Sequence, residues 1–525
     1  MYLIQPKQHS RRAFLKRSGQ LAFAGAALPT AINLAAMGEA AAQNAGADYK
    51  ALVCVFLYGG NDYANTVVPY DMSSYQAYQT IRGTTGSVMQ NGIALGRNPV
   101  TNPDGSITPG LSSTLLSPAI GGEPVSAIGQ TGLQFALHPS MAGMQSLFNA
   151  GQAAVMLNCG PLVVPLTKAT YNSSNRTLYP RPPKLFSHND QQSIWQSSSP
   201  EGSTIGWGGN IGDLALSGNG GNALFTCISL TGNAVFLAGD QALSYQVGSG
   251  GAVKINAVGS PYGFGNSTVG AAITQMLSPT GRSHILEREY ATVSSRAVGA
   301  EGVITSAIAG SAPANNVYQS PYNAFPADNL ASQLRMVARL IAARRTLGLK
   351  RQVFMVSLGG FDSHDNLIAD HTRNMGRVST AMKAFHDAMT ALGEANNVTA
   401  FTATDFGRTL SSNGDGSDHG WGSHQFVVGG AVNGAKFYGY APPVSVGNTT
   451  AALDQWHVGQ GRLLPTTSVD QYAATLAKWF GVSDTDLVGT AGQNYRDSIL
   501  PNLHNFGGTA GSINYARDLG FMKAP

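Results

Sequence analysis

Charged residues are scarce in this chain of 525 residues. Lys, Arg, Asp and Glu make up 11% of it, against about 25% in an average soluble protein. Removing the five basic residues and one acidic residue of positions 1–42 from totals of 32 and 28 leaves 27 of each sign. Beyond residue 42, the chain therefore offers no basic surface for nucleic acid or anionic lipid.

Cysteine is also rare, and long apolar runs are missing. Three cysteines do not make a disulfide framework. Cys54 and Cys159 lie in apolar, strand-like runs, so we expect both to be buried. The apolar stretch at 21–37 is interrupted by Pro29 and Asn33 and is shorter than the roughly 20 residues that a bilayer requires. We therefore expect no membrane span.

The N-terminus instead has the pattern of an export signal. Ser10-Arg11-Arg12-Ala13-Phe14-Leu15-Lys16 is a twin-arginine signal, and small residues at Ala40-Ala41-Ala42 follow the apolar stretch as a cleavage site. We expect the twin-arginine translocase to read residues 1–42 as a signal peptide, which makes the remainder periplasmic or secreted. This route usually carries folded proteins, often with a metal or cofactor inserted, and so favours a metal site.

Apolar β-rich runs alternate with helical patterns along the rest of the chain. The runs at 52–57, 153–158, 353–358 and 398–402 are typical of strands buried on both faces of a parallel sheet. Helical periods at 328–347 and 369–396 separate them. The pattern predicts an α/β domain over 48–525: a doubly wound, mostly parallel sheet flanked by helices, with loop-rich insertions. Residues 205–320, rich in glycine and short β-like runs, are expected to form an insertion or a β-rich cap.

Glycine, carboxylate and imidazole groups follow three of the predicted strands. The ends of parallel strands hold the ligands of open α/β sheets, so these groups predict one shared site. Asp and His together suit zinc, manganese or a metal pair. For each cluster alone, the alternative is that its Asp and His cap turns and satisfy loops. The clusters are Gly59-Gly60-Asn61-Asp62, Gly359-Gly360-Phe361-Asp362-Ser363-His364, and Thr404-Asp405-Phe406-Gly407 continuing to Asp418-His419-Gly420-Trp421-Gly422-Ser423-His424.

These motifs, in this order, resemble a bacterial family called domain of unknown function 1501, over nearly the whole chain after the leader. That family is grouped with the alkaline phosphatase and sulfatase superfamily, whose members hydrolyse phosphate or sulfate esters on a doubly wound sheet, usually with two divalent metals. Besides the leader and the three clusters, the motifs are Asn65-Thr66-Val67-Val68-Pro69-Tyr70, Leu137-His138-Pro139, Phe186-Ser187-His188, Gly206-Trp207-Gly208 and Arg408-Thr409.

The resemblance implies an alkaline-phosphatase-like fold that holds one or two divalent ions (zinc, manganese, calcium or magnesium). The late strand of a typical phosphatase ends in Asp-His, whereas Phe406 follows Asp405 here. His419 fills the second metal position only if the glycine-rich loop at 413–416 folds back. The expected metal ligands are Asp62, Asp362, His364, Asp405, Asp418, His419 and His424.

Three further residues are candidates for catalysis. Ser187 precedes His188 and a predicted helix at 190–195, and a helix N-terminus or a metal would activate its hydroxyl as a nucleophile. The alternative is that Ser187 caps this helix while His188 hydrogen-bonds a loop. Arg408 is either a phosphate clamp or the partner of a carboxylate that holds the loop.

Two functions from different classes follow. The first is an exported metal-dependent hydrolase of phosphate or sulfate esters, acting on a small-molecule or polymer ester. The second is a non-catalytic envelope protein that keeps the phosphatase-like fold and binds or assembles with an envelope protein partner. Neither function involves nucleic acid.

Overall fold

A computed structural model describes residues 49–83, 92–253, 267–310, 316–489 and 498–524. The predicted export signal lies outside these ranges. Within them, no helix has the length and apolar character needed to cross a membrane.

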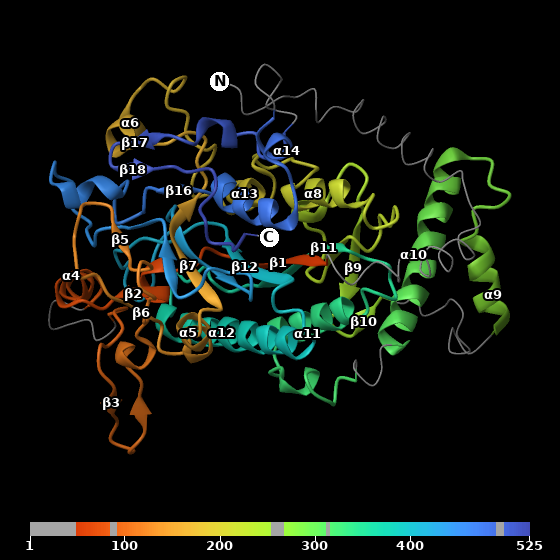
Figure 1. Cartoon of the computed structure of the whole chain (residues 1–525), viewed down its shortest axis with the longest axis horizontal. Helices are drawn as coiled ribbons and strands as arrows, with labels where there is room; N and C mark the ends of the chain where they lie inside the picture. Colours follow the sequence, from red (N-terminus) through yellow and green to blue (C-terminus); the bar gives the residue numbers. More distant parts are fainter. Residues whose placement is uncertain (1–48, 84–91, 254–266, 311–315, 490–497, 525) are drawn as a thin grey trace.

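A ten-stranded sheet runs through the middle of the molecule (Figure 1) in the order β10-β9-β8-β11-β1-β12-β13-β7-β14, with β16 paired to β7. Three pairs, β9 with β10, β12 with β13, and β13 with β7, are antiparallel, and the other pairs are parallel. This confirms the predicted mostly parallel sheet. The strands are β1 (Lys50–Leu57), β7 (Ala153–Gly160), β8 (Cys227–Ser229), β9 (Ser244–Gly248), β10 (Gly251–Ala252), β11 (Arg351–Leu358), β12 (Val398–Thr404), β13 (Ser423–Val428), β14 (Lys436–Tyr438) and β16 (Thr467–Ser468).

Helices and short two-stranded pairs surround this sheet. The helices are α3 (Tyr63–Thr66), α4 (Met72–Arg82), α5 (Ala142–Asn149), α6 (Lys168–Asn172), α7 (His188–Ser197), α8 (Trp207–Ala215), α9 (Ser267–Met276), α10 (Ile285–Gly310), α11 (Asn329–Ala342), α12 (Leu367–Ala391), α13 (Val469–Phe480) and α14 (Asp484–Val488). The short strands are β2 (Val67–Pro69), β3 (Val100–Thr101), β4 (Ile107–Thr108), β5 (Val125–Ser126), β6 (Phe135–Leu137), β15 (Tyr440–Ala441), β17 (Thr509–Ala510) and β18 (Ile513–Asn514).

Successive residues of β1 pack on opposite faces of the sheet, as the alternation of side chains along a strand requires. Val53 and Val55 join the core formed with α5, α11 and α12. Cys54 and Phe56 join the core formed with α8 and α13, and the two helix layers can be followed in Figure 1. The predicted burial of Cys54 and Cys159 is confirmed.

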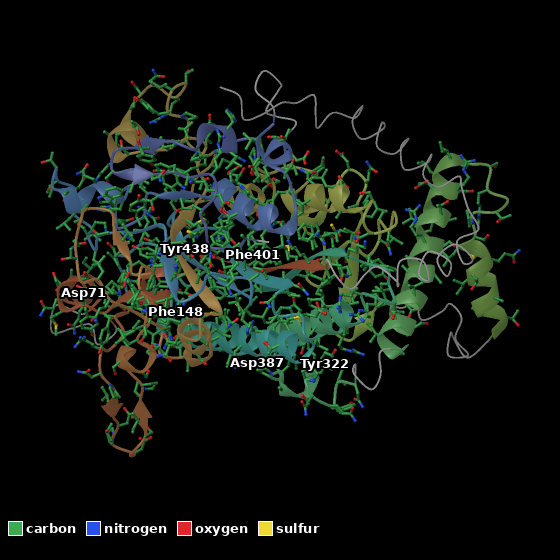
Figure 2. All side chains as sticks on the ribbon, viewed as in Figure 1. Asp71, Phe148, Tyr322, Asp387, Phe401 and Tyr438 are labelled. Atoms are coloured by element: carbon green, nitrogen blue, oxygen red, sulfur yellow. The ribbon has the colours of Figure 1, made fainter. Side chains whose placement is uncertain are left out.

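Large apolar side chains pack on both faces of the sheet. Phe148 and Phe401 belong to the two opposite cores and lie among densely packed side chains in Figure 2. Asp387, on the solvent side of α12, is half exposed. Met375, Val378, Met382, Phe385 and Met389 are buried and form the inward face of α12.

Residues 205–320 differ from the expected β-rich cap. Strands β8 and β9 join the parallel sheet beside β11 and extend it, and β10 completes its edge. Much of the rest of this range, where the structure describes it, is helical, in α8, α9 and α10. The difference has a physical cause, because these helices contain many Gly, Ala, Ser and Thr residues, which weaken the apolar period on which a helix prediction depends.

The strands that carry the three clusters are neighbours. Leu57 at the end of β1 pairs in register with Leu358 of β11 on one side and Thr404 of β12 on the other. All three strands are parallel, so the segments that follow them leave the sheet at one edge.

Candidate metal centre

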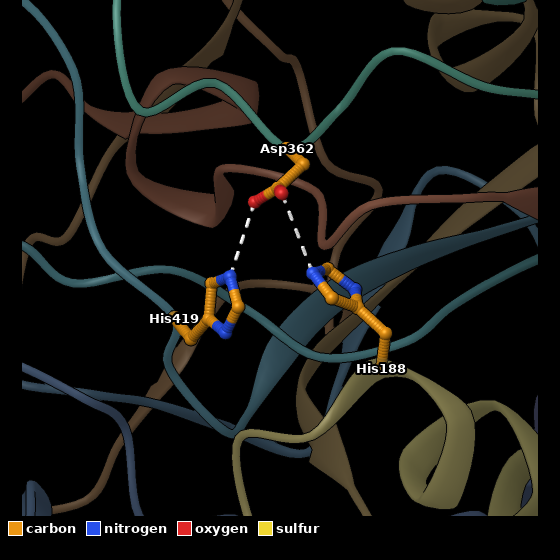
Figure 3. A group of neighbouring side chains, drawn as sticks. All are labelled: His188, Asp362 and His419. Carbon is orange, nitrogen blue, oxygen red and sulfur yellow. Dashed lines mark hydrogen bonds and ion pairs between the residues drawn. The ribbon is translucent and has the colours of Figure 1, made fainter.

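Asp362 lies between two imidazole rings at this edge (Figure 3). His188 Nε2 is 3.4 Å from one carboxylate oxygen of Asp362, and His419 Nε2 is 3.1 Å from the other. One ligand atom from each of the three side chains lies within 4.8 Å of the other two. Three donors therefore face a common point.

Three segments distant in sequence bring these groups together. His188 is the first residue of α7, and Asp362 follows β11. His419 is brought close because the loop after β12 folds back, pairing Arg408 with His419 as an antiparallel bridge. Gly416 makes this possible, since a Cβ there would collide with the backbone of His364. The condition for His419 to approach the site is therefore met.

The second ring nitrogen of each histidine is already anchored. His188 Nδ1 donates to Asp405 Oδ2 at 2.7 Å, and His419 Nδ1 donates to the carbonyl oxygen of Phe186 at 2.8 Å. In the neutral imidazoles both Nε2 atoms then carry the lone pair, and both are directed at Asp362. Metal-ligating histidines typically have such a hydrogen bond from the far nitrogen to a carboxylate or carbonyl.

Asp405 acts on His188 from a fully buried position. Its Oδ2 also accepts hydrogen bonds from the Gly59 backbone N–H at 3.2 Å and from Gln192 Nε2 at 2.9 Å. Gly59 has φ +115°, a conformation that L side chains rarely adopt. Among the described residues, Asp405 Oδ1 has no hydrogen-bond partner. The contacts of Asp405 Oδ2 thus orient His188.

Arg408 is buried and holds the opposite side of Asp362. Its Nη1 donates to Asp362 Oδ1 at 2.8 Å and to the Gly59 carbonyl at 3.1 Å. Its Nε donates to Ser417 Oγ at 3.0 Å, and Nη2 donates to the Ser417 carbonyl. These contacts include the carboxylate pair that is one of the two interpretations of Arg408 from the sequence. They leave Oδ2 of Asp362 facing His188.

His364 and Asp418 extend the cluster toward solvent. His364 Nε2 lies 3.0 Å from Asp362 Oδ1 and 3.1 Å from His419 Nε2. Its Nδ1 lies 3.5 Å from Asp418 Oδ1. Four of the predicted ligands, Asp362, His364, Asp418 and His419, therefore lie in one connected group, which His188 completes.

The protonation equilibria of the central groups are shifted in different directions. The hydrogen bond to Asp405 raises the pKa of His188 against the opposing effect of burial. Burial lowers the pKa of His419, although the Phe186 carbonyl and Asp362 oppose this. Burial disfavours the charged form of Asp362, but the Arg408 hydrogen bond and nearby positive charges outweigh it and lower the pKa.

Asp62 and His424 are not brought into this group. Both oxygens of Asp62 accept hydrogen bonds from Arg82, at 2.6 and 2.7 Å, inside the core. His424 Nδ1 accepts a hydrogen bond from the Asn158 backbone N–H at 3.1 Å, and its ring packs edge-on against Tyr63. The contacts described for both residues are with the surrounding core.

Ser187 occupies the N-cap position of α7, but its hydroxyl bonds no backbone N–H of the helix. Instead, the hydroxyl donates to Asp190 Oδ2 at 3.0 Å. The contact differs from the side-chain cap considered for this residue, and it directs the hydroxyl to a carboxylate of its own helix.

Sequence reasoning missed the groups that support the site. Gln192 lies one helical turn after His188, so its reach to Asp405 follows from the helix once that helix is placed. Arg82 ends α4 and uses its donors on Asp62, Asn65 and two backbone carbonyls of the later loop. The pairing of Arg82 with Asp62 has no local signal in the sequence.

Residues 303–490 match the model of a family described as a protein of unknown function, DUF1501. The match includes Asp362, Asp405 and His419 but not His188 or Asp62, and it covers part of the span over which the motifs resemble that family. No curated protein matches the chain. The crystal structure of the PsFucS1 sulfatase from Pseudoalteromonas sp. is a distant structural match, with 8% identity and a TM-score of 0.33 over 95% of this chain and 78% of that one.

Proposed function

We propose that this protein is a hydrolase of phosphate or sulfate esters that binds a divalent metal ion through His188, Asp362 and His419. One observation carries the proposal: both histidines are anchored at Nδ1, and both direct Nε2 at the same carboxylate. A cation among these atoms would relieve the repulsion between imidazole lone pairs and carboxylate oxygens. The donor set therefore fits a metal.

The donor types favour some ions over others. Two imidazoles and one carboxylate suit zinc or manganese better than calcium or magnesium, which prefer oxygen ligands. Asp362 has 42% of its side chain exposed, His188 30% and His419 26%. This exposure would leave coordination positions open to water and substrate, as in catalytic rather than closed structural sites. His364 and Asp418 stand beside the set as donors for a second ion.

A divalent ion held here would supply Lewis-acid activation of a water molecule or an ester oxygen. Asp405 would keep His188 in the tautomer and orientation that ligation needs. Arg408 would fix the Asp362 carboxylate and partly compensate its charge. These roles belong to residues that the fold already holds in place.

Arg462 supports an anionic substrate. Its Nε donates to the His419 carbonyl at 2.7 Å, and its guanidinium lies 5.3 Å from the centre of the Phe186 ring. In the described part of the chain, its terminal nitrogens have no hydrogen-bond partner. A guanidinium in this state is suited to bind two oxygens of a phosphate or sulfate group.

A non-catalytic envelope protein is the second candidate, and the structure offers one observation in its favour. Two of the three groups predicted to act in catalysis already have partners: the Ser187 hydroxyl bonds Asp190, and the Arg408 guanidinium bonds Asp362 and Ser417. In the hydrolase proposal, the nucleophile is therefore water rather than Ser187.

The place of action is proposed from the twin-arginine leader, Arg11 and Arg12. Changing both residues to Lys is expected to leave the precursor in the cytoplasm, because the translocase recognises the pair. Normal export of the double variant would contradict the proposed periplasmic or secreted location.

The enzymatic proposal is tested with protein purified from the periplasm, stripped with a chelator and reloaded with zinc or manganese. Aryl phosphate monoesters, phosphodiesters and sulfate esters are the substrates. Reloading is expected to restore turnover of at least one ester. The Ser187→Ala variant, loaded in the same way, is expected to retain most of this turnover. Arg462→Gln is expected to raise KM about tenfold or more through loss of a charge-assisted contact, while Arg373→Gln on the outer face of α12 leaves it unchanged. Fully loaded protein that hydrolyses none of these esters would favour the non-catalytic candidate.

A further inference from the structure

The N-terminal half of α10 exposes a continuous apolar stripe. Leu286 is 71% exposed, Tyr290 69% and Val293 51%, and Ala297 is also exposed. The spacing of four, three and four residues places them on one face of the helix. Farther along, Ala300 and Ile304 are buried in the core with β10 and α11 nearby. The same helix is thus anchored in the core at its C-terminal end and exposes the apolar stripe along its N-terminal half.

This stripe lies at one end of the molecule. In Figure 1, α9 and α10 stand beyond the β10 edge of the sheet, outside the two helix layers. Soluble proteins rarely leave several large apolar side chains adjacent on a surface without an interaction to cover them. Another chain can approach the stripe here without disturbing the metal centre, because none of that centre's residues lies on α9 or α10.

The charges beside the stripe fit a second copy of the same helix. The apolar spacing gives a heptad with Leu286 and Val293 at d and Tyr290 and Ala297 at a. The g positions are then Glu289 and Arg296, of opposite charge and one heptad apart. In an antiparallel pair of helices, g residues face g residues. The stripe is therefore complementary to itself.

We propose that this protein self-associates through α10, with the stripes of two copies packed antiparallel about a two-fold axis. Tyr290 then packs on Val293 of the second copy, and Leu286 packs on Ala297 of the second copy. Glu289 pairs with Arg296 of the second copy, and the symmetry repeats each contact. At the e positions, Glu287 faces Ser294 of the second copy, so no like charges meet.

A parallel arrangement fits less well. It would place the anchored end of each α10, where Ala300 and Ile304 enter the core, at the same end of the pair, so that the two sheets would compete for the same space. It would also set Glu289 against Ser294 of the second copy, which leaves the charge of Glu289 without a role. In the antiparallel arrangement, the two sheets lie at opposite ends of the helix pair. Both g residues then meet an opposite charge.

Charge reversal tests this arrangement in the full exported chain by sedimentation equilibrium. Wild-type protein is expected to form dimers as concentration rises. Glu289→Arg and Arg296→Glu are each expected to raise the dimer Kd about tenfold, since two attractive pairs become repulsive. An equimolar mixture of the two variants is expected to recover wild-type affinity as a heterodimer, because the opposite charges then meet again. Val293→Asp is expected to abolish association.

Glu287→Arg is the matched control, because it changes the same charge on the neighbouring edge and is expected to leave Kd unchanged. These side chains are exposed, and circular dichroism of each variant checks that the fold is retained. A dimer Kd that Glu289→Arg does not change would overturn the antiparallel pair. So would a mixture of the two variants whose Kd is as high as that of each variant alone. Wild-type protein that stays monomeric at every concentration would overturn self-association. The stripe would then be assigned to a different kind of partner.

Discussion

His188 and Asp405 are joined by a 2.7 Å hydrogen bond between the imidazole Nδ1 and a carboxylate with no exposed surface. The bond fixes the rotation of the ring, so Nε2 is directed at Asp362. Burial of Asp405 keeps water from competing for the same oxygen. The proposed metal centre therefore depends on Asp405, which contacts His188 at the ring nitrogen opposite the one that faces Asp362.

Asp405→Asn is expected to weaken zinc or manganese binding about 10- to 100-fold while the protein stays folded, as for other residues that orient a ligating histidine. The amide retains an oxygen acceptor but loses the negative charge that strengthens the bond to Nδ1–H. Competition with a chromogenic chelator measures the affinity. Asp387→Asn, at the exposed surface of α12, is the matched control. Equal affinities in the two variants would contradict the positioning role.

Asp62 and Arg82 are expected to serve stability rather than metal binding. Removing one partner of this buried pair in Arg82→Leu or Asp62→Asn should cost about 3–5 kcal/mol of unfolding free energy, because a charge is left buried without its partner. Urea unfolding measures this loss. Arg373→Leu, which breaks an exposed ion pair with Asp370, should cost less than about 1 kcal/mol. Loss of metal from folded Asp62→Asn protein would instead restore Asp62 as a ligand.

Acid should destabilise the protein through His371. Burial lowers the pKa of this histidine to about 4, against the opposing charge of Asp62, whereas the unfolded chain keeps a value near 6.5. Between these values the unfolded state binds more protons, so stability is complete above about pH 6.5 and is lost as pH falls toward 4. The loss from this residue is about 3 kcal/mol.

Unfolding free energies measured by urea titration between about pH 4.5 and 8 test this. In His371→Gln, the unfolding free energy should fall less steeply as the pH is lowered. His284→Gln, in the exposed segment before α10, should leave the pH dependence of the wild type unchanged. Burial also lowers the pKa of His138, to about 3. The His371 variant should therefore still lose some unfolding free energy in acid. A wild-type protein equally stable across this range would contradict the linkage.

The central strands can be predicted from the sequence, because short apolar runs bounded by glycine are typical of buried strands in an α/β chain. The sequence also predicts that Asp362 and Asp405 follow buried strands and share one site; in the structure these strands, β11 and β12, flank β1. It does not distinguish Asp362 from Asp62, because both end a Gly-Gly cluster. The difference arises from Arg82, which reaches Asp62 only after α4 has folded against the loop that contains Leu410.

The direction in which a side chain points also cannot be predicted from sequence patterns. His188 is recognised as a candidate beside Ser187, but its place between Asp405 and Asp362 depends on the start of α7 and on the fold of a distant loop. The exposed stripe of α10 is hard to recognise in the sequence for a related reason. Its four apolar residues stand among charged and small residues, which weaken the apolar period of the segment.

The metal content of the folded protein tests the central claim most directly. Protein exported in medium supplemented with zinc and manganese, then dialysed, is analysed by inductively coupled plasma mass spectrometry. The wild type should contain at least one divalent ion per chain, and so should Asp387→Asn. Asp362→Ala, His188→Ala and His419→Ala should lose that ion while circular dichroism shows an intact fold. Folded wild-type protein without bound metal, or metal retained in all three variants, would contradict a centre built on His188, Asp362 and His419.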